Sequence, residues 1–191
     1  MPELIFSLFS IGLWLAVLIC DLRLRRVPIP LTLLLLLISL IGQPWPWWAL
    51  TVLMLAWPRS WAAWIMLPAA ALGWLTNDPA PAIAATCGTI AWGSRWWGGA
   101  DSLALLAMAL RFGLAGLLSG ALAVCTAGVL VMLKRRRSFD ALLPVLQDMA
   151  QLRAVPAKIP ADTELPAAAA LAVAGIILEV GRTLIGLMAV S

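Results

Sequence analysis

Apolar segments follow one another along almost the whole chain, and they restrict the fold more than any other feature of the sequence. A helix that crosses a bilayer needs about 20 apolar residues. The segments at 4–20, 114–133 and 165–189 approach or exceed that length. The full series is 4–20, 29–42, 47–57, 61–75, 80–92, 102–113, 114–133 and 165–189. This pattern predicts an all-α, polytopic transmembrane helical bundle with about six to eight membrane segments.

Composition agrees with a membrane location. Hydrophobic residues make up 63% of the chain and charged residues 12%, whereas a soluble domain carries about 25% charged residues. With 191 residues, the chain has no room for a separate soluble domain of ordinary size. We therefore expect a single integral-membrane domain over residues 1–191.

The basic residues predict an orientation. Arg23, Arg25 and Arg26 form one cluster, and residues 134–137 form another. Both clusters flank apolar segments, which is typical of cytoplasmic loops. Eight crossings would place both clusters inside and both termini outside, and six crossings give the same parity. A nucleic-acid site is a weaker interpretation of these clusters because both are short and lie beside membrane segments. We expect no nucleic-acid partner.

The residue types that are absent exclude several kinds of chemistry. The chain contains no histidine and no tyrosine, and its three cysteines, Cys20, Cys87 and Cys125, lie in or beside apolar segments. A Cys/His zinc site, a disulfide framework and a histidine-dependent triad are therefore not expected. General acid–base chemistry would rely on Asp, Glu, Lys or Cys. We predict no metal and no cofactor.

Two further stretches, at the start of the chain and at 138–164, each need an interpretation of their own. Glu3 and the lack of a small-residue cleavage pattern indicate that residues 1–20 form a retained first helix rather than a signal peptide. The polar stretch 138–164 carries apolar residues at helical spacing, which predicts a cytoplasmic amphipathic loop on the membrane surface. The residues at that spacing are Leu142, Leu143, Leu146 and Met149.

Asp101 stands at the start of an apolar segment, directly after Gly98, Gly99 and Ala100. A charge at the centre of a membrane helix costs about 2.5–3.5 kcal/mol or more, so this carboxylate needs a water boundary or a function. The two glycines allow another backbone to come close. The plainer interpretation is that Asp101 caps the helix that follows.

Asp21 is a second carboxylate at a segment end, and the predicted topology places it at the same membrane face as Asp101. Two carboxylates brought together in a low-dielectric setting do not both ionise easily, so one retains a proton. Such a pair can activate a water molecule and protonate a peptide carbonyl. The alternative for Asp21 is an ion pair with Arg25. Among the other acids, we expect Glu179 to pair with Arg182 on the next turn.

Three stretches resemble the type IV prepilin peptidases, which belong to the GxGD group of aspartic membrane proteases. Cys20-Asp21-Leu22-Arg23-Leu24-Arg25-Arg26-Val27-Pro28 is similar to the family's D-x-x-x-R-x-I-P stretch. Gly98-Gly99-Ala100-Asp101, followed by residues 102–106, is similar to the G-x-G-D-x-K-L motif, without its lysine. Lys158-Ile159-Pro160 is similar to the stretch before the family's last span.

The resemblance implies an activity. Enzymes of this family remove a short basic leader from prepilins or pseudopilins at the cytoplasmic face of the cell inner membrane. Asp21 and Asp101 would be the catalytic pair, and Gly98 and Gly99 would shape the turn that presents Asp101. The partners would be the substrate and the lipid bilayer. The cysteine-rich loop associated with N-methylation in larger members is absent, so the chain resembles the minimal form.

Two other functions stay open at this point. A small membrane transporter could use boundary aspartates to relay protons or bind a cation. However, transporter sites usually lie near the midplane, and no inverted repeat is visible in this sequence. An inactive scaffold of a secretion system would keep the fold without the chemistry.

Overall fold

The computed structural model describes residues 2–24, 27–93, 97–134 and 167–188. Every element in these ranges is a helix, which confirms the all-α prediction. The elements are α1 (Pro2–Leu24), α2 (Ile29–Leu40), α3 (Trp45–Ala56), the 3-10 helix η1 (Arg59–Ile65), α4 (Met66–Thr76), α5 (Pro79–Gly93), α6 (Gly99–Lys134) and α8 (Ala167–Met188). The predicted amphipathic loop at 138–164 lies outside the described residues.

A proline directly precedes each of three helical elements in the first half of the chain. Pro28, Pro44 and Pro58 occupy the position before α2, α3 and η1, each with an extended backbone. Proline suits a helix start because the first N–H groups of a helix have no partner in the helix. At the end of α4, Asn77 adopts a left-handed conformation with φ of 53° and ψ of 28°, which terminates the helix.

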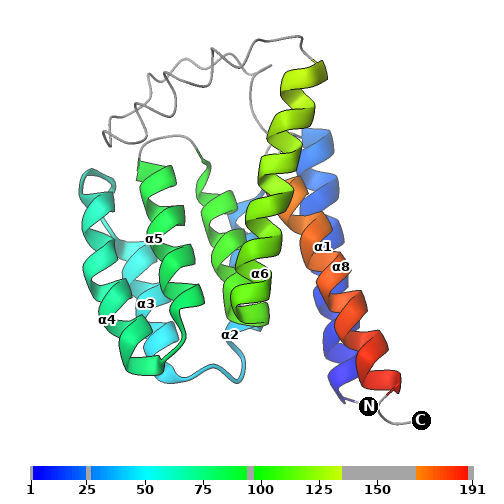
Figure 1. Cartoon of the computed structure of the whole chain (residues 1–191), viewed down its shortest axis with the longest axis horizontal. Helices are drawn as coiled ribbons and strands as arrows, with labels where there is room; N and C mark the ends of the chain where they lie inside the picture. Colours follow the sequence, from blue (N-terminus) through cyan, green and yellow to red (C-terminus); the bar gives the residue numbers. More distant parts are fainter. Residues whose placement is uncertain (1, 25–26, 94–96, 135–166, 189–191) are drawn as a thin grey trace.

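The helices run along roughly one direction and pack side by side (Figure 1). Helices α1 and α8 are neighbours at one side, α6 lies between α8 and α5, and α4 packs against α5. The start of α1 and the end of α8 lie at the lower end in this view. The opposite end holds the last turn of α1 and the first turns of α6 and α8.

Small residues allow the helices on the α1 side to pack closely. Trp14 is fully buried in α1, and a Cβ atom at Gly175 of α8 would lie 2.6 Å from its indole ring. Outside this packing, large apolar side chains remain exposed, among them Ile5, Leu122 and Ile185, which are 68–69% exposed. An apolar exterior of this kind is typical of a lipid-facing surface.

Among the described residues, three helices are long and apolar enough, by length and composition, to cross a membrane, over Leu4–Leu24, Gly99–Leu130 and Ala167–Gly186. They indicate a membrane protein. The predicted number of six to eight segments is not confirmed, because the elements between α1 and α6 are shorter than a full span, at 7–15 residues.

Helix α6 is broken at Gly113, whose φ of 59° and ψ of −140° are not helical. In Figure 1 the ribbon of α6 turns back at its lower end, so that the arms 99–112 and 114–134 lie side by side. A Cβ atom at Gly120 would lie 3.3 Å from the sulfur atom of Met108, although these residues would be about 18 Å apart in a straight helix. The break falls at the boundary predicted between the segments 102–113 and 114–133.

Candidate functional site

Asp21 lies in the last turn of α1 and is 8% exposed. Its Oδ2 atom accepts a hydrogen bond of 2.7 Å from the backbone N–H of Ala169. That N–H belongs to the first turn of α8, where the helix itself supplies no acceptor. A carboxylate is also favoured there by the helix dipole. Asp21 therefore joins the end of α1 to the start of α8, a contact between residues 148 positions apart.

Asp101 belongs to the first turn of α6. Its Oδ2 atom accepts a hydrogen bond of 2.9 Å from the backbone N–H of Gly98. The first bond of the helix runs from the N–H of Ser102 to the carbonyl oxygen of Gly98, at 3.4 Å. Gly98 is thus the residue before the helix, and Asp101 reaches back to it in the manner of the acidic residue of a capping box. The interpretation of Asp101 as the N-cap residue is corrected: Gly98 occupies that position, and Asp101 contacts it from the third helical position.

The two glycines before Asp101 contribute space. A Cβ atom at Gly98 would lie 3.3 Å from the Oδ2 atom of Asp101, and one at Gly99 would lie 3.7 Å from the indole nitrogen of Trp92. Among the described glycines, the left-handed φ values occur at Gly42 and Gly113, so neither Gly98 nor Gly99 is required for its backbone conformation. A Cβ atom would be tight at Gly98 and in ordinary contact at Gly99. That they present Asp101 for chemistry stays a prediction.

Helix α5 fixes the residue that follows Asp101. The hydroxyl group of Ser102 donates a hydrogen bond of 2.7 Å to the carbonyl oxygen of Gly88, and Ser102 is 1% exposed. A Cβ atom at Gly88 would lie 3.2 Å from the Cβ atom of Ser102 and 3.3 Å from its Cα atom. The start of α6 therefore sits directly on the α5 backbone, at a position that only glycine fits without displacement.

Arg59 fixes the end of α5. Its Nε and Nη2 atoms donate hydrogen bonds of 3.0 and 2.6 Å to the carbonyl oxygen of Trp92, and its guanidinium carbon lies 5.1 Å from the centre of the Trp92 ring. A cation at the C-terminal end of a helix is favoured by the helix dipole. Because Trp92 also approaches Gly99, Arg59 contacts the residue that borders the start of α6.

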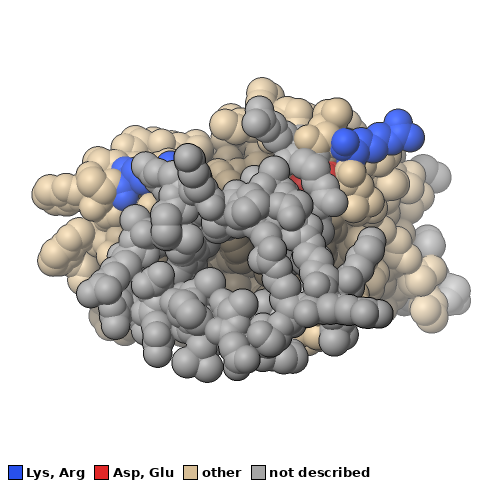
Figure 2. Space-filling view, turned by 90° about the horizontal axis from the view of Figure 1, so that it is seen from above, with Lys and Arg blue, Asp and Glu red and all other residues tan. Residues whose placement is uncertain are grey.

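Both predicted site residues thus lie at the same end of the bundle (Figure 1). Figure 2 looks onto this end. Basic atoms lie toward both sides of the face, and acidic atoms are visible between the tan and grey surfaces. Asp21 and Asp101 each have an interaction beyond those given above. That their carboxylates act as a pair stays a prediction.

A second charged site lies deeper in the bundle, at the far end of the first arm of α6. The Nε atom of Arg111 lies 2.8 Å from the Oε1 atom of Glu179, and its Nη2 atom lies 3.5 Å from Oε2. Glu179 is fully buried, and the side chain of Arg111 is 13% exposed. The guanidinium carbon of Arg111 also lies 4.7 Å from the centre of the Phe6 ring.

This ion pair corrects the prediction that Glu179 pairs with Arg182. Glu179 is fully buried, whereas Arg182, on the next turn of α8, is exposed. A buried carboxylate requires a partner in the interior, and Arg111 supplies it from α6. The signal that could have found this pair is the position of Arg111, a charge directly after the apolar run 103–110.

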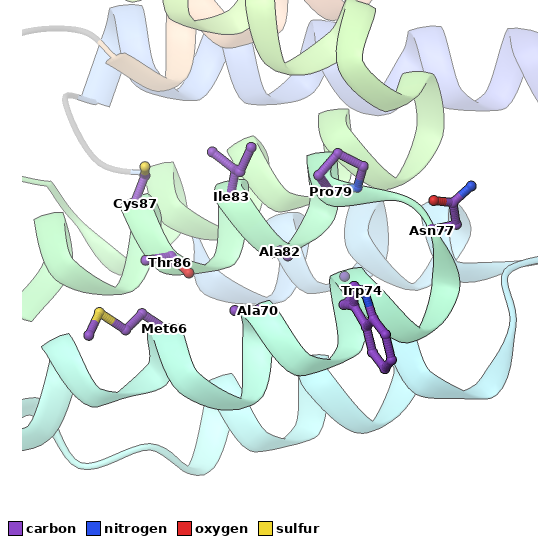
Figure 3. A pocket seen from close by; sticks show the side chains of 10 residues that line it. Met66, Ala70, Trp74, Asn77, Pro79, Ala82, Ile83, Thr86 and Cys87 are labelled. Atoms are coloured by element: carbon purple, nitrogen blue, oxygen red, sulfur yellow. The ribbon is translucent and has the colours of Figure 1, made fainter.

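The described residues contain no group of three or more His, Cys, Asp or Glu that could hold a metal ion. An open groove of about 570 Å³ lies between α4 and α5, and Figure 3 shows its mainly apolar lining. The lining residues are Met66, Ala70, Gly73, Trp74, Asn77, Pro79, Ala82, Ile83, Thr86 and Cys87. Neither Asp21 nor Asp101 lines this groove.

No protein-family model, no curated protein and no solved structure matches the chain. The resemblance to the prepilin peptidases therefore rests on the motif residues of the sequence alone.

Proposed function

We propose that the chain is a membrane aspartic endopeptidase that removes the basic leader peptide from type IV prepilins or pseudopilins at the cytoplasmic face of the membrane. The observation that carries the proposal is the position of the two motif aspartates. Asp21 and Asp101 come from distant parts of the sequence, lie at helix ends at one end of the bundle, and are each held by a backbone N–H group.

The proposed reaction needs water and two carboxyl groups. One carboxylate accepts a proton from water as the water oxygen forms a bond to the peptide carbonyl carbon, while the other, protonated carboxyl group donates its proton to the carbonyl oxygen. When the C–N bond breaks, the amine nitrogen takes up a proton, and the products are a carboxylic acid and a new N-terminus. The backbone hydrogen bonds to Asp21 and Asp101 support this chemistry, because they hold both side chains in place before substrate binds.

The charges at this end of the bundle support a cytoplasmic location. Arg23 belongs to the last turn of α1, and Lys134 ends α6 at the same end of the bundle. Basic residues flanking apolar helices are typical of the cytoplasmic side. A prepilin carries its leader on that side, directly before a membrane helix, so the scissile bond would meet the aspartates at the membrane boundary.

The test is processing of a prepilin-type substrate by the purified wild-type chain and by Asp21→Asn and Asp101→Asn. Asparagine keeps an oxygen that accepts the backbone hydrogen bond, so both variants should fold. Asp78→Asn is the matched control, because Asp78 also accepts a backbone hydrogen bond, from Ala80 at the start of α5 (3.2 Å), outside the proposed site. We expect loss of processing in the first two variants alone. Full processing by either of them would disprove the aspartic mechanism.

A further inference from the structure

The Arg111–Glu179 ion pair has no part in the proposed chemistry, although its burial is unfavourable. Removing two charges from water carries a desolvation penalty, and an apolar pair of similar volume is often as stable or more stable. Charged residues inside a membrane protein therefore usually have a function. The question is what this pair provides that leucine and methionine would not.

The sequence spacing places the ion pair at the same depth below the aspartate level on both helices. Arg111 follows Asp101 by ten residues on α6, and Glu179 follows Ala169 by ten residues on α8. Ala169 is the residue whose N–H holds Asp21. Ten residues of α-helix rise about 15 Å. The ion pair therefore lies about 15 Å below Asp101 on one helix and about 15 Å below the Asp21 anchor on the other.

The packing surfaces between these levels contain many small side chains. The buried part of α8 begins with Ala167, Ala168, Ala169 and Ala170, and the first arm of α6 also contains buried alanines, Ala104 and Ala107. Small side chains allow helices to approach closely, and bulkier contacts of α8 occur where Trp14 lies against Gly175 and where Leu171 lies against Gly120. A two-point contact between guanidinium and carboxylate is directional and adds a restraint against axial sliding to this packing.

We infer that Arg111 and Glu179 are positioning residues that set the depth of α8 against α6, and so bring the anchor of Asp21 level with Asp101. Arg111 also packs on Phe6 of α1, the helix that carries Asp21. The pair thus connects the three helices that present the two aspartates. This inference rests on the proposed function for its catalytic consequence, whereas the helix register can be measured without it.

Kinetics of leader cleavage test the catalytic consequence. Glu179→Asp keeps the charge but shortens the side chain by one methylene group, so the pair can re-form only if the helices shift. We expect kcat to fall about tenfold or more, since misplacement by about 1 Å can reduce a rate 100-fold, while KM stays within about twofold. The double variant Arg111→Glu with Glu179→Arg restores a pair and should recover much of the kcat lost in either single variant. Arg182→Gln, three residues further along α8, is the matched control.

Disulfide formation tests the register independently. In a chain whose three native cysteines are replaced by serine, cysteines at positions 120 and 171 report on the contact between the second arm of α6 and α8, because a Cβ atom at Gly120 would lie 3.0 Å from the Cδ2 atom of Leu171. We expect Glu179→Asp and Glu179→Gln to slow this cross-link. An unchanged cross-linking rate in both variants, or wild-type kcat in Glu179→Asp, would overturn the inference. If the wild-type chain does not cleave the prepilin-type substrate, the proposed function is wrong. The cross-linking rate then tests the helix register by itself.

Discussion

Gly88 offers the sharpest test of how the structure positions Asp101. In Gly88→Ala, the new Cβ atom would lie 3.2 Å from the Cβ atom of Ser102 and 3.3 Å from its Cα and carbonyl oxygen atoms. Carbon atoms in ordinary contact are about 3.5–4.0 Å apart. Because two of these three atoms belong to the backbone, the first turn of α6 has to move away from α5 by roughly 0.3–0.7 Å. Asp101 immediately precedes Ser102 and moves with it.

The expected effects of Gly88→Ala on the catalytic rate and on the free energy of unfolding differ in size. Overpacking costs about 1–3 kcal/mol, and alanine gains about 0.5–1 kcal/mol over glycine within a helix. The net loss of stability is therefore about 0–2.5 kcal/mol, which corresponds to a lowering of Tm by roughly 0–10 °C for a chain of this size. A displacement of about half an ångström at a catalytic group lowers the rate by roughly tenfold. We expect a moderate effect on unfolding and a larger one on kcat.

The assay compares Gly88→Ala with Gly12→Ala, in which a Cβ atom on helix α1 would meet nothing within 4 Å. Both variants replace a helical glycine by alanine, so the helix propensity gain is the same in each. Thermal unfolding in detergent and single-turnover cleavage of a prepilin-type substrate are measured on the same preparations. If Gly88→Ala cleaves at the wild-type rate with an unchanged Tm, the close approach of α5 does not position Asp101.

Two other substitutions test the framework around the site. In Gly113→Ala the new Cβ atom would meet no atom within 4 Å, so the substitution acts only through the strain of a positive φ. We expect the free energy of unfolding to fall by about 1–3 kcal/mol, measured by thermal unfolding, and no fall for the control Gly186→Ala. Equal Tm values for the two variants would refute the tight turn at Gly113. Arg59→Ala removes two hydrogen bonds and a ring contact at Trp92. We expect substrate cleavage to slow severalfold in this variant and to proceed at the wild-type rate in the control Arg23→Ala. Equal cleavage rates in both variants would show that the end of α5 does not affect the site.

Features encoded by local sequence could be predicted well. The alternation of apolar segments predicted helices throughout, and the break of α6 at Gly113 coincides with a predicted segment boundary. The extended backbone before α2, α3 and η1 follows from prolines at those positions. In each case a few neighbouring residues determine the outcome, because proline lacks an N–H group and glycine tolerates a positive φ.

Contacts between distant segments could not be predicted in the same way. Glu179 has Arg182 within its own helix, yet it pairs with Arg111, which is 68 residues away. The choice depends on which face of α8 is buried, and α8 has apolar residues on several faces. Similarly, an Asp at the end of α1 is equally consistent with a surface ion pair. Its role as the acceptor for Ala169 depends on how α1 packs against α8.

The contact with Ala169 means that Asp21 has a structural role as well as its proposed chemical one, and the two roles can be separated by the choice of substitution. Asp21→Ala leaves a buried N–H of α8 without its acceptor, which costs about 1–3 kcal/mol. Asp21→Asn keeps an acceptor oxygen and should unfold close to the wild-type temperature. If Asp21 is catalytic, both variants lose cleavage although only alanine lowers Tm. If Asp21 serves only to cap α8, cleavage follows Tm, and the asparagine variant remains active.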